Sequence, residues 1–233
     1  MSASSAHVFD LAETSLRAMH EILHALPPDT NETDWRIVNP RGRHCLAVGL
    51  TAPLALLIDG HAGYYAAGMN DRARVTINGN AGPGVAENMM SGEVRVRGNA
   101  SMAAGATGQG GLLVIEGDAG ARCGISMKGI DIVVRGNVGH MSGFMAQEGN
   151  LVVCGDAGEA LGDSLYEARL FVRGAVRSLG ADCQETEMTE ADRAMLAALL
   201  QRAQCGDVDP GDFRLYASAR NLYHFHVDHA QSY

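Results

Sequence analysis

Histidine and carboxylate side chains gather near the carboxyl end of the chain, with the types and spacing of metal ligands. The cluster consists of His224, His226, Asp228 and His229. Imidazole and carboxylate groups suit zinc or iron, so an isolated metal-binding module is one hypothesis for this segment. No second ligand motif accompanies the cluster, and tails of mixed aromatic and polar residues more often dock on a neighbouring chain. We therefore expect no metal here and predict four partner-docking residues: Tyr223, His224, Phe225 and His226.

Paired carboxylates are a second possible source of chemistry. Asp118 and Asp156 belong to a polar column that also contains Asn80, Asn99 and Asn137. Asn137 separates the two aspartates, which places them two coils, or about 10 Å, apart in a stacked repeat. A stand-alone enzyme that cleaves polysaccharide would instead need clustered carboxylates and aromatic platforms along an outer groove. The column is better explained as a ladder of side chains that bond their own turn and the next coil.

The glycine-rich stretch 105–111 and the cysteines add no catalytic motif. The stretch lacks the GxxxxGK[ST] pattern and the strand, GxGxxG and helix unit of nucleotide sites. The cysteines are odd in number and contain no CxxC pair, which argues against a disulfide framework, a zinc ribbon or a bound iron–sulfur cluster. They are Cys45, Cys123, Cys154, Cys183 and Cys205. We expect neither a catalytic residue nor a cofactor site in this chain.

Charge and composition favour a soluble, cytoplasmic protein that binds neither nucleic acid nor membrane. The net charge of −9 opposes contact with phosphate backbones or anionic lipid. The first residues lack the basic start and apolar run of a secretory signal, and the longest apolar stretch is broken by Gly49 and Pro53. Because only 5% of residues are aromatic, the core must be filled by alanine and aliphatic side chains.

A 19-residue repeat positions all of these residues. Seven glycines recur at this spacing: Gly60, Gly79, Gly98, Gly117, Gly136, Gly155 and Gly174. The positions two and four residues before each glycine are always Leu, Ile or Val, the period-2 signature of a short strand with one face inward. The position two residues after each glycine is Ala or Val, which suits a tight corner. We predict an all-β fold, a right-handed parallel β-helix of about seven coils.

Further glycines recur in the same register. They are Gly63, Gly82, Gly120, Gly139 and Gly158, and Gly105, Gly124, Gly143 and Gly162. We expect both sets to turn the backbone with positive φ in coil after coil.

Helices are predicted on both sides of the rod. Asp10 and Glu13 resemble a capping box for an amphipathic helix that Pro27 ends. Strands over 35–38 and 45–50 would lead into the first coil, and a second helix over 189–204 would follow the last. The chain thus divides into an N-terminal helix with lead-in strands at 1–50, the β-helix at 51–180, and a C-terminal helix with a docking tail at 181–233.

One outward column is apolar over four successive coils. It consists of Val114, Val133, Val152 and Phe171. An exposed apolar stripe of this kind usually marks a covered face. Either the helix over 189–204 or a partner chain could cover it, and we predict the partner. The adjoining column, with Arg97, Glu116, Arg135 and Arg173, would form a polar rim.

The coils with the pattern G-x-x-G-x-x-x-G, such as 117–124 and 136–143, resemble the C-terminal β-helix (GXGXG) domain of the glutamate synthase large subunit. The likeness covers about residues 51 to 180. As a free-standing chain, the protein resembles the β-helix subunit of the N-methylglutamate synthases, in which the glutamate synthase domains occur as separate subunits. The resemblance implies a non-catalytic scaffold between an amidotransferase-like subunit and an FMN-binding synthase subunit, with FMN and an iron–sulfur cluster in the partner chains.

That complex would make N-methyl-L-glutamate and ammonia from methylamine and L-glutamate. The start Met1-Ser2 agrees with this division of labour, because it cannot supply the N-terminal cysteine nucleophile of such amidotransferases. A scaffold subunit of a formylmethanofuran dehydrogenase-type complex is the alternative within the same class.

Overall fold

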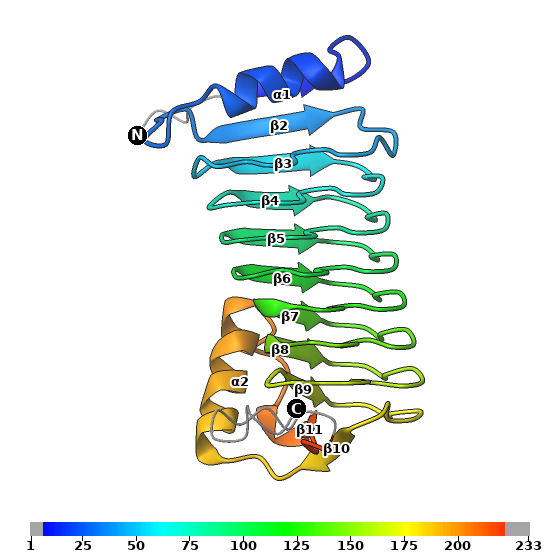
Figure 1. Ribbon diagram of the computed structural model, residues 1–233. Helices are drawn as coiled ribbons and strands as arrows, with labels where there is room; N and C mark the ends of the chain where they lie inside the picture. Colours follow the sequence, from blue (N-terminus) through cyan, green and yellow to red (C-terminus); the bar gives the residue numbers. More distant parts are fainter. Residues whose placement is uncertain (1–6, 222–233) are drawn as a thin grey trace, which may run out of the picture.

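Alternating apolar residues in each repeat form a short strand, and these strands stack in register along one sheet. The computed structural model describes residues 7–221. The stacked strands are β3 (Ala55–Asp59), β4 (Arg74–Ile77), β5 (Glu93–Val96), β6 (Leu112–Ile115), β7 (Lys128–Val134), β8 (Glu148–Val153) and β9 (Arg169–Val172). Each pairs in parallel with the next. This arrangement confirms the predicted right-handed parallel β-helix (Figure 1).

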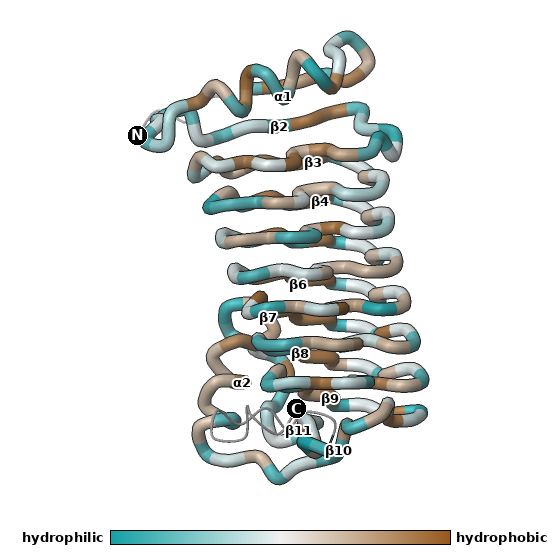
Figure 2. The backbone as a smooth tube through the Cα atoms, in the orientation of Figure 1, coloured by the Kyte–Doolittle hydropathy of each residue, from teal (hydrophilic) through white to brown (hydrophobic). Residues whose placement is uncertain are grey.

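The rod interior is filled by the columns that the repeat predicted. Val75, Val94 and Leu113 stack in register and are fully buried. A second ladder of single parallel bridges runs through the small corner residues, from Ala62 to Val176. Figure 2 shows hydrophobic and hydrophilic segments alternating along successive coils. A narrow core of aliphatic side chains therefore runs the length of the rod.

Two different physical reasons explain the recurring glycines. At Gly155 a Cβ atom would lie 2.6 Å from the carbonyl oxygen of Gly136 in the preceding coil, so only glycine permits this backbone approach. Gly82 meets the backbone of Gly63 in the same way, at 2.6 Å from its carbonyl carbon. The set Gly63, Gly82, Gly120, Gly139 and Gly158 lacks the positive φ we predicted, whereas Gly105, Gly124, Gly143 and Gly162 have it.

The N-terminal end of the rod is closed by a strand pair and a helix. Strand β1 (His7–Asp10) pairs in parallel with β2 (Asp34–Val38), which pairs with β3. The sheet thus starts before the predicted rod boundary at residue 51. Helix α1 (Leu16–His24) lies over this end (Figure 1) and buries Met19 and Leu23 in the rod core.

Two local predictions at this end are wrong. The first helix begins after the Ser15 cap rather than at Asp10, whose side chain accepts the Ala12 amide in a turn. Residues 45–50 form turns rather than a strand, because Cys45 and Ala47 adopt left-handed backbone conformations that no strand contains.

At the C-terminal end the sheet changes direction. Strand β11 (Arg214–Ser218) pairs antiparallel with β9, and β10 (Cys183–Thr186) pairs antiparallel with β11. Helix α2 (Glu190–Arg202) follows β10 in the chain, and a short 3-10 helix η1 (Pro210–Asp212) precedes β11. The predicted second helix is confirmed, and Thr189 caps it in a capping box with Asp192.

Candidate interaction surface

The outer face of the sheet carries the apolar stripe that we predicted as a partner interface. Val114, Val133, Val152 and Phe171 are all 0% exposed in the isolated chain. They pack with Leu196, Leu199, Leu200 and Ala203 in a second core, separate from the rod interior. The prediction that a partner covers these four residues is wrong, because the chain's own helix already removes them from solvent.

The length of α2 matches the coils beneath it. Its 13 residues rise about 20 Å at 1.5 Å each, and the four steps from β9 to β5 span about 19 Å. Its first turn contacts Arg169, which ion-pairs with Asp192, and its last carbonyls reach Arg95. Figure 1 shows α2 running along the rod axis beside β7, β8 and β9, so the contact with Arg95 of β5 is made at the far end of the helix.

Arg95 is the anchor that sequence reasoning missed. It interrupts the outward column between Thr76 and Val114, yet its side chain is only 8% exposed. The guanidinium donates to the carbonyl oxygen of Ala203 at 3.1 Å and lies 3.2 Å from Glu93 and 3.4 Å from Glu116. A cation at the C-terminal end of a helix also interacts favourably with the negative end of the helix dipole. The only sequence signal was a charged residue directly before the apolar part of the column, which starts at Val114.

An ionic rim surrounds the second core, as the adjoining column predicted. Arg135 pairs with Asp207 at 2.8 Å, and Arg173 pairs with Asp212 at 3.1 Å. On the other side of the helix, Arg202 approaches Asp131 at 3.3 Å. Most of these side chains are partly exposed, so each pair contributes little alone. Together they fix the position of α2 and of the segment that follows it as far as Asp212. We call this part of the chain the cover.

Cys154 and Cys205 form a thiol pair where the rim meets the second core. The pKa of Cys205 is lowered to about 7, because its sulfur accepts a hydrogen bond from Cys154 and lies near Arg135. The same contact raises the pKa of Cys154, which burial raises further. Burial alone raises the pKa of Cys123 to about 12. Cys205 therefore has a lowered pKa, whereas the pKa values of Cys154 and Cys123 are raised.

The same outer face is bare over its first coils. There the outward column continues as Val8, Arg36, Leu57 and Thr76. A groove of about 440 Å³ crosses it. Its lining includes Asp34, Trp35, Arg36, Leu57, Arg74, Thr76 and Arg97. This groove and the α2 cover are two halves of one surface.

The polar column forms the expected ladder. The Asn80 side-chain oxygen accepts the amide of Asn99 at 2.9 Å, and this contact repeats coil by coil through Asp156 to Ala175. Asn137 also donates its side-chain amide to Asp118 at 3.1 Å. One carboxylate oxygen of Asp118 and one of Asp156, Oδ1 in each case, therefore hold adjacent coils together.

The remaining candidate sites have structural surroundings or lie outside the described residues. In the stretch 105–111, a Cβ atom at Gly108 would lie 2.8 Å from the Ile130 side chain, so this glycine admits an apolar neighbour. Among residues 7–221, no three histidine, cysteine or carboxylate side chains meet as a metal site. Tyr223, His224, Phe225 and His226 lie outside that range, so their predicted docking role stays a prediction.

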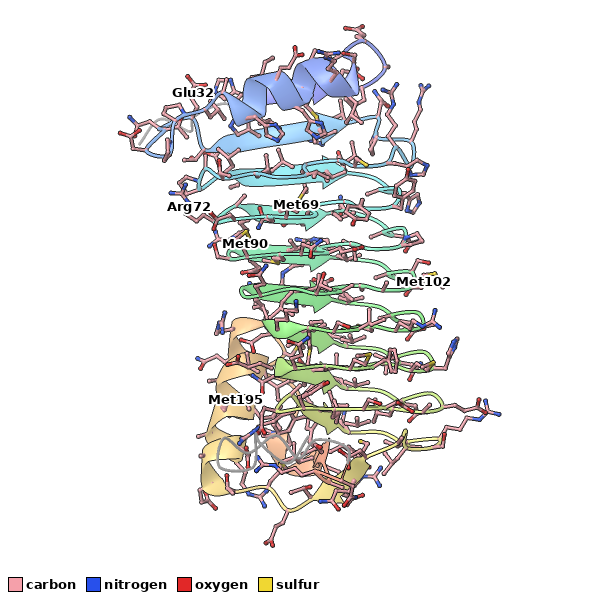
Figure 3. All side chains as sticks on the ribbon, in the orientation of Figure 1. Glu32, Met69, Arg72, Met90, Met102 and Met195 are labelled. Atoms are coloured by element: carbon pink, nitrogen blue, oxygen red, sulfur yellow. The ribbon has the colours of Figure 1, made fainter. Side chains whose placement is uncertain are left out.

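Exposed methionines do not form a single apolar patch. Met69, Met90, Met102 and Met145 are each 41–52% exposed. Figure 3 places Met102 at the opposite edge of the rod from Met90, while Met195 lies on α2. Within the described range, no helix is both long enough and apolar enough to cross a membrane.

Comparison with known proteins identifies one full-length relative. The chain is 59% identical over 226 residues to Protein GlxC of Rhizobium meliloti (strain 1021), a match that covers 97% of this chain and 99% of that protein. No family model matches the sequence.

Proposed function

We propose that this chain, which belongs to the family of Protein GlxC, is a non-catalytic structural subunit of a glutamate synthase-like complex. The proposal is supported by the rod itself, whose coils carry the G-x-x-G-x-x-x-G pattern that resembles the glutamate synthase β-helix domain. The observation that carries it is the use of the polar and glycine columns. Each ladder residue from Asn80 to Asp156 uses its Oδ1 atom to accept an amide of the next coil, and the glycines permit close backbone contact between coils.

The reaction that we assign to the complex is the synthesis of N-methyl-L-glutamate and ammonia from methylamine and L-glutamate. The partner chains are an amidotransferase-like subunit and a synthase-like subunit that binds FMN. The iron–sulfur cluster of the complex also lies in the partner chains. The complex works in the cytoplasm. In this scheme the chain supplies no nucleophile, acid or base, and its contribution is to hold the two partners in place.

A parallel β-helix is well suited to that task. Each coil is bonded to its neighbours by backbone amides and carbonyls, so the rod resists bending between its ends. The seven steps from β2 to β9 give a length of about 34 Å. A stiff spacer reduces the conformational freedom that a complex would otherwise lose on assembly.

Purification of the tagged full-length chain from its own cells tests this proposal. We expect a flavin-containing chain and an amidotransferase-like chain to co-purify in fixed ratio, and the complex to form N-methyl-L-glutamate. The isolated chain should show neither flavin absorbance nor turnover with methylamine and L-glutamate. Flavin or activity in the isolated chain, or the absence of both partners from the purified material, would overturn the proposal.

A further inference from the structure

We infer that the bare groove over β2 to β5 binds an acidic, amphipathic helix from a partner chain, which extends the line of α2 along the rod. The inference rests on the proposed function for the existence of a partner. It adds where that partner binds and with what chemistry.

The repeat register places equivalent arginines in the covered and bare halves. Arg74 lies five coils before Arg169, in the same column, and Arg169 pairs with Asp192 of α2. Arg97 lies in the column of Arg135 and Arg173, which pair with Asp207 and Asp212 of the same cover. The bare half therefore repeats the cationic positions that hold carboxylates in the covered half.

These two arginines have no carboxylate of their own. Within residues 7–221, neither Arg74 nor Arg97 forms an ion pair, although both are exposed and line the groove. The third groove arginine, Arg36, is paired with Asp59. The groove lining also contains the carboxylate of Asp34. Arg74 and Arg97 still leave an excess of positive charge, which is complementary to an acidic ligand.

The groove also offers apolar surface between the arginines, although less than the α2 seat. In the outward column Leu57 lines the groove beside the methyl-bearing Thr76, and Val8, at the start of the column, is 59% exposed. The bare coils from β2 to β5 span about 14 Å, enough for a helix of about nine residues. An apolar stripe on such a helix would contact Leu57, with carboxylates on either side, in the usual helix-in-groove arrangement.

The test uses the full-length chain in its own cells, with Thr76 replaced by the photoreactive residue p-benzoylphenylalanine. Irradiation should join it to a different polypeptide, and mass spectrometry should map the adduct to a helical segment that contains Asp or Glu. The double variant Arg74→Glu with Arg97→Glu should reduce the adduct about tenfold. A matched double variant, Arg122→Glu with Arg193→Glu, changes the net charge equally at exposed arginines outside the groove and should not reduce it.

The outcomes separate this inference from the proposed function. An adduct with a second copy of this chain, with its own residues 222–233, or with a segment lacking carboxylates would overturn the inference. So would an adduct insensitive to charge reversal, or no adduct although the synthase-like subunits co-purify, and the last result would leave the proposed function standing. A charge-dependent adduct with an acidic helix of some other protein would support the inference and contradict the proposed function.

Discussion

The guanidinium of Arg95 donates a hydrogen bond of 3.1 Å to the carbonyl oxygen of Ala203, which lies 108 residues later in the chain. This contact joins the middle of the rod to the end of α2. It also brings Arg95 between two carboxylates, Glu93 and Glu116, so one buried cation satisfies three acceptors.

Arg95→Met should therefore release the end of α2. Removing one partner from a buried ionic network leaves the others unpaired, at a cost of about 3 kcal/mol. Amide hydrogen exchange in α2 should accelerate, while exchange in β3 and β4 stays slow. The control is Arg97→Met, two residues later, where no ion pair with a described residue is lost. Equal exchange rates for α2 in the two variants would show that Arg95 does not anchor it.

Val133→Asp should detach the whole cover without unfolding the rod. Val133 is buried between β7 and α2, and a carboxylate there without a partner should cost several kcal/mol. Val134→Asp places the same charge inside the rod core and should unfold the chain. Limited proteolysis should cleave near α2 in the first variant and throughout in the second.

The matched control for that pair is Thr76→Asp, in the same outward column but on the bare half. It should leave the proteolysis pattern of the isolated chain unchanged. Resistance of α2 to protease in Val133→Asp would mean that the second core tolerates the charge, and would contradict the packing of α2 on Val133.

Gly155→Ala should destabilise the rod through backbone crowding. The added Cβ would lie 2.6 Å from the carbonyl oxygen of Gly136, so the two coils must separate. We expect a loss of about 1–3 kcal/mol in the free energy of unfolding, measured with denaturant. Gly206→Ala, where a Cβ meets nothing within 4 Å, should be neutral or slightly stabilising. A similar loss in both variants would show that the close contact between the coils is not its cause.

The strands and their register could be predicted because they depend on a local pattern. Each coil buries the residues two and four positions before its glycine, such as Ile132 and Val134, so a repeated alternation identifies the inward face. The antiparallel return of β11 to β9 leaves no such signal, because it depends on pairing between Leu215 and Phe171, 44 residues apart in the sequence.

The errors have equally specific causes. The residues from Cys45 to Leu50 form a short apolar run of the length of a strand, but Cys45, Ala47 and Gly49 have left-handed backbone conformations. An outward apolar stripe looks the same whether α2 or another protein covers Val133, since both would bury it against leucines. Only the three-dimensional course of the chain distinguishes them, and the anchor at Arg95 depends on a carbonyl group that every residue possesses.

Cys205 should make the stability of the cover depend on pH. Its folded pKa is lowered to about 7 from the ordinary thiol value of 9.0. Between these values the unfolded chain binds the proton that the folded chain has lost, so stability should rise as pH increases through this window and fall as pH decreases toward 7. The difference in melting temperature between the wild type and Cys205→Ser should grow from pH 6.5 to 9 in the wild type's favour. A constant difference across that range would contradict the lowered pKa.

The match between α2 and the coils beneath it divides the repeats into two kinds. Because α2 contacts Arg169 at its start and Arg95 at its end, loss of a coil between β5 and β9 would leave the helix one step too long for its seat. The coils between β3 and β5 have no such hydrogen bond or ion pair with a described helix, and excising 19 residues there would keep every column in register while shortening the rod by about 4.8 Å. The number of coils can therefore vary in the bare half of the rod but not in the half that α2 covers. Rod length can change through the bare coils while the seat of α2 keeps its size.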